Sequence, residues 1–131
     1  MTVVIDASVA FAGAVRGGRD SQWAREILNR DDLIAPELLL VEVASVARKA
    51  VNRGALPAAY AKTLVEGLGG MLSALIPHSP LMPRIWQLRE NLTSYDAAYV
   101  ALAEALDVPL ATLDRKVSRA PGLFCHILAP R

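Results

Sequence analysis

The chain has 131 residues, of which 53% are hydrophobic, and this provides enough apolar material for a buried core. Its 14 Lys and Arg residues nearly balance its 13 Asp and Glu residues, so the formal net charge is +1. This composition excludes a disordered chain, a strongly basic arm for nucleic acid and an acidic tail, because each needs a charge excess.

The first half of the chain alternates short apolar runs with segments of helical periodicity. The pattern predicts a strand over Thr2–Ile5 and then a helix from Ala7 to the Gly17–Gly18 pair. A second helix over Ser21–Arg30 and a second strand over Leu33–Ala35 follow. Pro36 then predicts the start of a long helix, because proline favours the first helical position, and Gly54 ends this helix after Arg53. Pro57 starts another helix, which ends at the glycines of residues 67–70.

The second half continues the alternation with shorter strands. It predicts a strand over Leu75–Pro77, followed by one helix over Pro80–Leu92 and another over residues 93–106. Two further strands are predicted over Val108–Leu113 and His126–Leu128. Thr93 and Asp96 match the two ends of a capping box at the start of the second helix. Short strands that alternate with helices imply a parallel sheet with helices on both faces. We therefore expect an α/β fold of three layers with a short central parallel sheet, and one domain over residues 1–131.

Cys125 is the only cysteine, so the chain cannot form an internal disulfide or a cysteine-rich zinc site. The longest stretch without charged residues, Gly67–Pro83, contains three glycines and three prolines and would make a poor membrane helix. The N-terminal residues Met1–Asp6 lack the basic flank and the apolar length of a signal peptide. We therefore expect a cytoplasmic protein that does not enter a membrane.

Four acidic residues stand out by their positions in these elements. Asp6 and Asp114 each follow a predicted strand, and ligands of open parallel sheets bind beyond the carboxyl ends of the strands. Asp96 lies in the first turn of a helix. Taken alone, each aspartate can be explained as a helix cap or a turn residue, Asp96 in a capping box with Thr93. Taken together with Glu42, they describe one site.

Glu42 is harder to explain by structure alone. Its neighbours on the same face of an apolar helix are Leu38, Leu39, Ser45 and Val46. The side chain is therefore expected to point inward or into a cleft, where an unpaired glutamate costs on the order of several kcal/mol. Arg48 and Lys49 are the candidate partners on the same helix, and neither lies one turn away.

Carboxylates that are crowded together raise one another's pKa, so a cluster of them stays ionised only when a cation neutralises it. Oxygen ligands without histidine or cysteine select Mg²⁺ or Mn²⁺ over zinc. A pocket of four carboxylates with such an ion suits the hydrolysis of phosphodiesters, because the metal lowers the pKa of water and neutralises charge on the phosphate.

The motifs around these residues resemble those of the PIN-domain family. They are Val4–Ser8, Glu42 in a helix after Pro36, Tyr95–Ala103 and Leu110–Asp114. Their order and spacing are similar to those of VapC-type ribonuclease toxins of VapBC toxin–antitoxin pairs, over nearly the whole chain. The resemblance implies a three-layer PIN-like nuclease domain and a Mg²⁺-dependent endoribonuclease. It also implies that water is the nucleophile and that cleavage leaves a 5′-phosphate and a 3′-hydroxyl.

The resemblance implies roles for individual residues as well. The catalytic carboxylates, which would also be the ligands of Mg²⁺ or of Mn²⁺ in its place, are Asp6, Glu42, Asp96 and Asp114. Ser8 and Thr112 would be the hydroxyls that orient these carboxylates. Arg115 and Lys116 stand where the family often has an acidic residue or an asparagine, so the number of metal ions stays open.

The expected partners follow from the same resemblance, because family members are commonly dimeric and are silenced by a bound antitoxin. It implies an RNA substrate, a cognate antitoxin and a homodimer. Arg115 and Lys116 are candidates for contact with RNA phosphates, although a solvated basic surface is the simpler explanation of each. The antitoxin is expected to place an amphipathic segment in a groove near the carboxylates.

Two alternatives stay open at this point. The first is a PIN-type nuclease that processes RNA and is not a toxin, because the sequence does not separate these roles. The second is a receiver-like Mg²⁺-binding signalling domain. The receiver fold requires two adjacent acidic residues after its first strand, whereas Asp6 is followed by Ala7 and Ser8.

The net charge of +1 by itself argues against a protein that works on nucleic acid. If the four carboxylates lie in one metal-binding cleft, however, the rest of the chain has 14 basic and 9 acidic residues, a balance of +5. The sequence thus predicts a local negative site within a mildly basic surface.

Overall fold

The sheet of this protein is parallel. The computed structural model describes residues 1–15, 17–30 and 32–131, and within them the strands are β1 (Thr2–Ile5), β2 (Asp32–Pro36), β3 (Ala74–Ile76), β4 (Leu110–Ala111) and β5 (Ile127–Leu128). They form one sheet in the order β3-β2-β1-β4-β5, and the pairs of neighbouring strands are parallel. The predicted short parallel sheet is therefore confirmed, with β1 at its centre.

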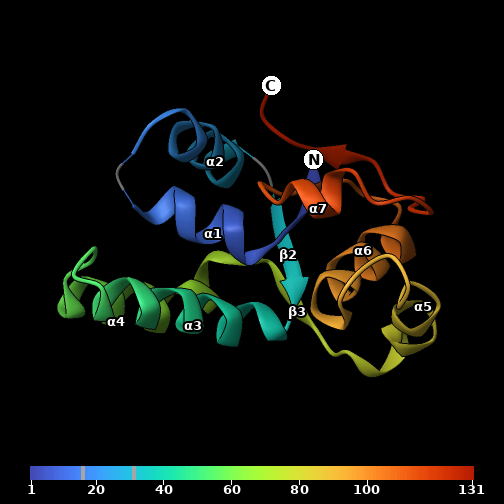
Figure 1. Cartoon of the computed structure of the whole chain (residues 1–131), viewed down its shortest axis with the longest axis horizontal. Helices are drawn as coiled ribbons and strands as arrows, with labels where there is room; N and C mark the ends of the chain where they lie inside the picture. Colours follow the sequence, from blue (N-terminus) through green and yellow to red (C-terminus); the bar gives the residue numbers. More distant parts are fainter. Residues whose placement is uncertain (16, 31) are drawn as a thin grey trace.

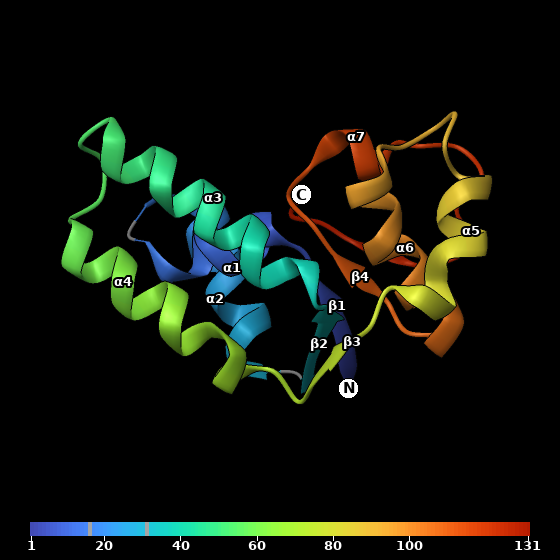
Figure 2. The same ribbon diagram turned by 90° about the horizontal axis from the view of Figure 1, so that it is seen from below.

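Helices cover both faces of the sheet. They are α1 (Ala7–Ala14), α2 (Arg19–Arg30), α3 (Leu38–Asn52), α4 (Ala58–Gly67), α5 (Met82–Gln87), α6 (Ser94–Leu106), α7 (Arg115–Ser118) and the 3-10 helices η1 (Leu68–Met71) and η2 (Ser79–Leu81). Figure 1 shows α1 to α4 on one side of β2 and α5 and α6 on the other, and Figure 2 shows the same separation from below. The predicted three-layer α/β fold is thus confirmed. Across the described ranges, no helix has the length and apolar character needed to cross a membrane.

The core is built around β1 and α6. Val3, Val4 and Ile5 of β1 are fully buried, as expected for a central strand with helices on both faces. The residues from Ala97 to Ala103 are all buried as well, so α6 presents no polar face over this stretch. Four of these residues are alanines, and their small side chains let α6 pack closely against β1, β2 and β4. The two elements that lead to Asp6 and carry Asp96 are therefore rigidly packed.

The prediction that Pro36 begins a helix is wrong. Pro36 is the last residue of β2, where it pairs with Ile76 of β3, and α3 begins at Leu38. The pairing of β2 with β1 ends at Ile34, so no hydrogen bond to β1 requires a backbone N–H at position 36, where proline has none. An interior strand can therefore end on a proline here.

Two other predicted boundaries are too long. The first helix ends at Ala14, because Val15 adopts an extended backbone, and it does not reach the Gly17–Gly18 pair. The strand expected over Val108–Leu113 pairs with its neighbours at Leu110–Ala111. The hydrogen bonds of this segment to the neighbouring strands run from the carbonyl of Pro109 to the N–H of Thr112, whereas the N–H of Leu113 turns to Ser8 Oγ.

The expected single helix over Pro80–Leu92 is also wrong. This segment consists of the short 3-10 helix η2 followed by α5, which ends at Gln87. At Leu88 the backbone leaves the helical region, and its N–H bonds back to the carbonyls of Arg84 and Ile85. The apolar stripe continues through Leu92 because these turns also pack on the core, so periodicity alone did not reveal the break.

His78 anchors the start of α3 from outside that helix. Its Nε2 atom accepts a hydrogen bond of 3.1 Å from the backbone N–H of Leu38. Glu37, which precedes the helix, gives no side-chain cap, and its N–H donates to the carbonyl of Ile76 at 3.0 Å. The segment after β3 therefore sets where α3 begins, and with it the position of Glu42 about one turn later.

We expect His78→Ala to lower the free energy of unfolding by about 1 kcal/mol, because the Leu38 N–H loses its acceptor at the helix start. Urea unfolding followed by circular dichroism at neutral pH measures this change. His126→Ala removes an exposed imidazole beside β5 and is the matched control, with little change expected. Equal losses in the two variants would contradict a capping role for His78.

Candidate active site

Two of the four acidic residues follow neighbouring strands. β1 and β4 pair with Ile5 opposite Ala111, so the two strands end at the same edge of the sheet. Asp6 follows β1 directly, and Asp114 comes shortly after β4. Each is also the N-cap of the helix that follows it, α1 or α7. Asp6 and Asp114 therefore each cap a helix and also lie at the same edge of the sheet.

Asp6 is a buried carboxylate with three hydrogen-bond donors, and it is 6% exposed. Its Oδ1 accepts bonds from Ser8 Oγ at 2.5 Å and from the N–H of Val9 at 3.2 Å, and Oδ2 accepts one from Thr112 Oγ1 at 2.5 Å. Burial raises the pKa of Asp6 in spite of these donors, which lower it, and the charge of Asp96 adds to the rise. The donors hold both carboxylate oxygens in place.

Ser8 and Thr112 also connect Asp6 to the chain that leaves β4. Ser8 Oγ accepts a bond of 3.0 Å from the N–H of Leu113, and Thr112 Oγ1 accepts one of 2.9 Å from the N–H of Asp114. Each hydroxyl thus donates to Asp6 and accepts from the backbone at the same time. The two hydroxyls predicted to orient carboxylates therefore both bind Asp6, and they also hold the backbone N–H groups of Leu113 and Asp114.

Glu42 on α3 is paired across the molecule rather than along its own helix. Its Oε1 accepts a bond of 2.5 Å from the hydroxyl of Tyr99 on α6, while the basic residues later in α3 are exposed. Burial raises the pKa of Glu42, the Tyr99 bond lowers it, and the charges of Asp96 and Asp6 raise it. Sequence reasoning missed Tyr99, whose one signal was its place a turn after Asp96.

Asp96 lies in the first turn of α6. Its N–H donates to Thr93 Oγ1 at 3.2 Å, so Thr93 forms its half of the predicted capping box. Burial raises the pKa of Asp96, the charge of Asp114 raises it further, and the charge of Lys116 lowers it. Asp114 in turn accepts a bond of 2.8 Å from the N–H of Lys116. Asp96 is therefore within electrostatic reach of the start of α7.

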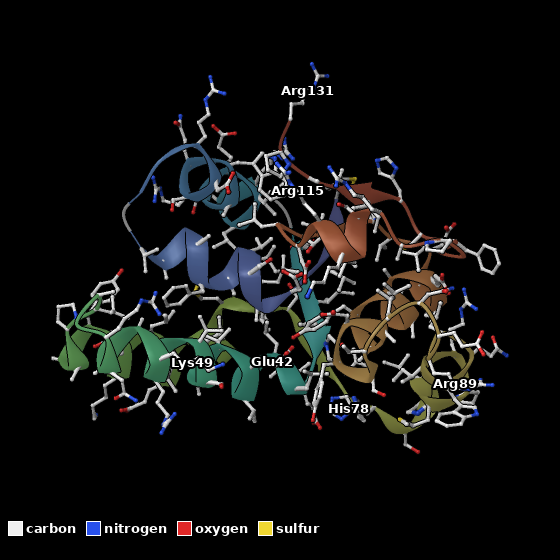
Figure 3. The ribbon with its side chains drawn as sticks, in the orientation of Figure 1. Glu42, Lys49, His78, Arg89, Arg115 and Arg131 are labelled. Atoms are coloured by element: carbon white, nitrogen blue, oxygen red, sulfur yellow. The ribbon has the colours of Figure 1, made fainter. Side chains whose placement is uncertain are left out.

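The four carboxylates form one electrostatic group, with Asp96 as the common member. Its charge acts on Asp6 and on Glu42, and the charge of Asp114 acts on it. In Figure 3, Glu42 lies at the central end of α3, whereas Lys49 lies further along that helix. The structure thus places the predicted acidic residues, from the ends of β1 and β4 and from α3 and α6, around one region.

This group is not a closed metal cage. In residues 1–15, 17–30 and 32–131, no three His, Cys, Asp or Glu side chains are close enough together to hold a metal ion. The chemistry of the donors nevertheless fits a hard divalent cation, because they are carboxylate oxygens supported by hydroxyls. The charges that shift Asp6 and Glu42 are negative, so a cation between them would replace repulsion by attraction.

Helix α7 brings positive charge to the border of the acidic group. Arg115 and Lys116 are both exposed, and Lys116 is the residue whose charge acts on Asp96. Arg115 lines a pocket together with Arg119 and Arg131. Basic side chains therefore follow Asp114 directly in the chain, and Lys116 lines one pocket together with Asp96.

Residues 3–123 match the family model described as the PIN domain. Ribonuclease VapC1 of Mycobacterium tuberculosis is 40% identical over 125 residues, which cover 95% of this chain and 94% of that protein. Ribonuclease VapC9 of the same species is 36% identical over 130 residues, which cover 98% of this chain and 99% of that protein. The solved structure of PAE2754 from Pyrobaculum aerophilum has the same fold, with a TM-score of 0.72 and 24% identity over 97% of this chain and 83% of that chain.

We expect Asp96→Asn to stabilise the metal-free protein at neutral pH. Because the pKa of Asp96 is raised in the folded state, its contribution to stability is fully present below the ordinary value of 3.8. That contribution is lost as the pH rises through the folded-state pKa. The uncharged asparagine avoids this loss, so the advantage of the variant should shrink as the solution is acidified.

Urea unfolding in EDTA over a series of pH values measures this difference. Asp32→Asn is the control, because Asp32 is exposed at the amino end of β2, away from the carboxylates. A wild-type protein that is as stable as Asp96→Asn at neutral pH would contradict repulsion within the acidic group.

Proposed function

The chain belongs to the PIN-domain family, and we propose that it is a divalent-metal-dependent endoribonuclease that acts as the toxin of a type II toxin–antitoxin pair. The observation that carries the proposal is the single electrostatic group formed by Asp6, Glu42, Asp96 and Asp114. Relatives named as ribonucleases match along nearly their full length, which supports RNA as the substrate. Membership of this family leaves no place for the receiver-like alternative.

The four carboxylates are the side chains that would hold Mg²⁺ or Mn²⁺. When bound, such an ion lowers the pKa of water and neutralises charge on the phosphate. The chain's own residues supply orientation. Ser8 and Thr112 fix the two oxygens of Asp6, and Tyr99 fixes one oxygen of Glu42. Because Asp6 is buried, its negative charge would attract a bound cation more strongly than it would in water.

The RNA would lie over the carboxylates with its phosphates against α7. Arg115 and Lys116 place two positive charges directly after Asp114, so one short helix offers both a carboxylate and phosphate contacts. Single-stranded or loop RNA suits such a site, because its backbone can enter and its bases can be splayed out. Water would attack the phosphorus, which leaves a 5′-phosphate and a 3′-hydroxyl.

A cognate antitoxin and a second copy of the chain complete the proposal. A pocket among α1, α2 and α4 is lined mainly by apolar side chains, among them the half-buried Leu28, Leu64 and Leu72 and the exposed Met71. Such a surface supports an amphipathic antitoxin segment as the partner. The nuclease would act on RNA in the cytoplasm, and the bound antitoxin would restrain it.

We expect Asp6→Asn and Asp96→Asn to slow RNA cleavage by about 100-fold or more, because each removes a charge from the group that would hold the cation. Initial rates on a labelled single-stranded RNA with Mg²⁺ or Mn²⁺ measure the loss, and EDTA should abolish wild-type cleavage. Asp32→Asn should keep wild-type activity. Circular dichroism checks that each variant is folded. Equal cleavage by all of these proteins, with and without EDTA, would overturn the proposed nuclease.

The same variants separate a toxin from an RNA-processing enzyme in cells. Induction of the wild-type chain should arrest growth, and induction of Asp6→Asn should not. Co-expression of the cognate antitoxin should restore growth to the wild-type culture. Normal growth on induction of a chain that cleaves RNA in the tube would favour the processing role.

We expect Lys116→Ala to weaken RNA binding and to reduce the slope of log affinity against log salt by about 0.7, the value for one lost phosphate contact on a single strand. Fluorescence anisotropy in EDTA, over a series of salt concentrations, measures this slope without cleavage. Lys49→Ala removes an equal charge from the outer part of α3 and is the control (Figure 3). Identical slopes for Lys116→Ala and wild type would rule out the contact.

A further inference from the structure

The contact between Tyr99 and Glu42 joins the two helices that carry carboxylates of the site. Tyr99 is 2% exposed, so its ring lies in the core of the protein. Its hydroxyl nevertheless ends at Oε1 of Glu42, 2.5 Å away and 57 residues earlier in the chain. A phenol at the boundary between a core and a polar site usually finds a hydrogen-bond partner, and here the partner is a carboxylate of the acidic group.

The spacing of residues on α6 makes this contact part of the site. Asp96 and Tyr99 are three residues apart, and residues at this spacing lie on the same face of a helix. The face of α6 that presents a carboxylate near Asp6 and Asp114 therefore also presents the hydroxyl that reaches α3. A residue on another face of α6 could not make both sets of contacts.

Glu42 needs such a partner because the neighbouring negative charges repel its carboxylate from the acidic group. Asp6 and Asp96 are both negative, and their charges act on Glu42. The cations on its own helix, Arg48 and Lys49, are exposed and do not lie one turn from it. A glutamate side chain also has three rotatable bonds, so without a fixed donor it would turn away from the other carboxylates.

We propose that Tyr99 is a positioning residue, whose hydroxyl holds Oε1 of Glu42 and thereby keeps this carboxylate among the side chains that would hold the divalent cation. This inference rests on the proposed metal-dependent function. The tyrosine is suited to the task because its ring is packed in the core and its hydroxyl has one position. Partners of metal-binding carboxylates that act in this way commonly change metal affinity by about 10-fold to 100-fold when they are removed.

Mn²⁺ binding to the RNA-free protein, followed by electron paramagnetic resonance, tests the proposal without any measurement of activity. Tyr99→Phe should weaken Mn²⁺ binding by about tenfold or more, the effect of losing a carboxylate's orienting partner. Tyr60→Phe is the matched control, because the Tyr60 hydroxyl also donates a hydrogen bond, to the carbonyl of Ala14 on α1. This control should bind Mn²⁺ like the wild type.

A double-mutant cycle shows whether Tyr99 acts through Glu42. In a Glu42→Gln background, Tyr99→Phe should cause no further loss of Mn²⁺ affinity. An equal loss in both backgrounds, or wild-type affinity in Tyr99→Phe, would overturn the positioning role and leave the proposed nuclease intact. A wild-type protein that binds no Mn²⁺ would overturn the metal-dependent function and this inference with it.

Folding is checked in the same series, since Tyr99→Phe removes one oxygen and keeps the ring in the core. Circular dichroism and urea unfolding of the metal-free variants give a second cycle. The midpoint shifts of Tyr99→Phe and Glu42→Gln should be non-additive because the two side chains share one hydrogen bond. Additive shifts would contradict the contact itself.

Discussion

A carboxylate can be buried only where hydrogen-bond donors reach it, and this requirement connects the elements at the centre of the molecule. Asp6, at the end of the central strand, takes bonds from Ser8 and Val9 at the start of α1 and from Thr112 after β4. The two hydroxyls also accept backbone N–H groups on the way to α7. Asp6 and its two hydroxyl partners thus join the end of β1, the start of α1 and the segment between β4 and α7, and the sheet order that sets β4 beside β1 brings Thr112 to Asp6.

The other half of the site depends on the burial of α6. Because this helix is buried from Ala97 to Ala103, it lies against the sheet and holds Asp96 and Tyr99 at a fixed distance from α3. The result is a group of like charges whose repulsion opposes folding, bordered by the basic start of α7. The whole-chain charge of +1 conceals this arrangement, because it sums a negative site and a mildly basic remainder.

Part of this site could be predicted from residue patterns. Asp6 and Asp114 follow apolar runs that alternate with helices, and in a parallel sheet such residues meet at one edge. Glu42 stood out because no partner on its own helix explained it. Tyr99 could not be found in this way, since its one signal, a place one turn after Asp96, does not separate a ring that only fills the core from one whose hydroxyl reaches another helix. The pairing across 57 residues is set by how α3 and α6 pack on the sheet.

The sequence by itself determined the alternation of strands with helices, the three-layer class and the places of the acidic residues at strand ends and in helices, because periodicity and strand-end position are local properties. The tertiary structure decided the features that depend on a distant neighbour. Pro36 ends β2 rather than beginning α3 because Ile76 pairs with it, and α3 begins where His78 meets Leu38. Glu42 is held by a tyrosine from the opposite layer. Local signals carry no information about such partners, since these contacts exist only once the layers have packed together.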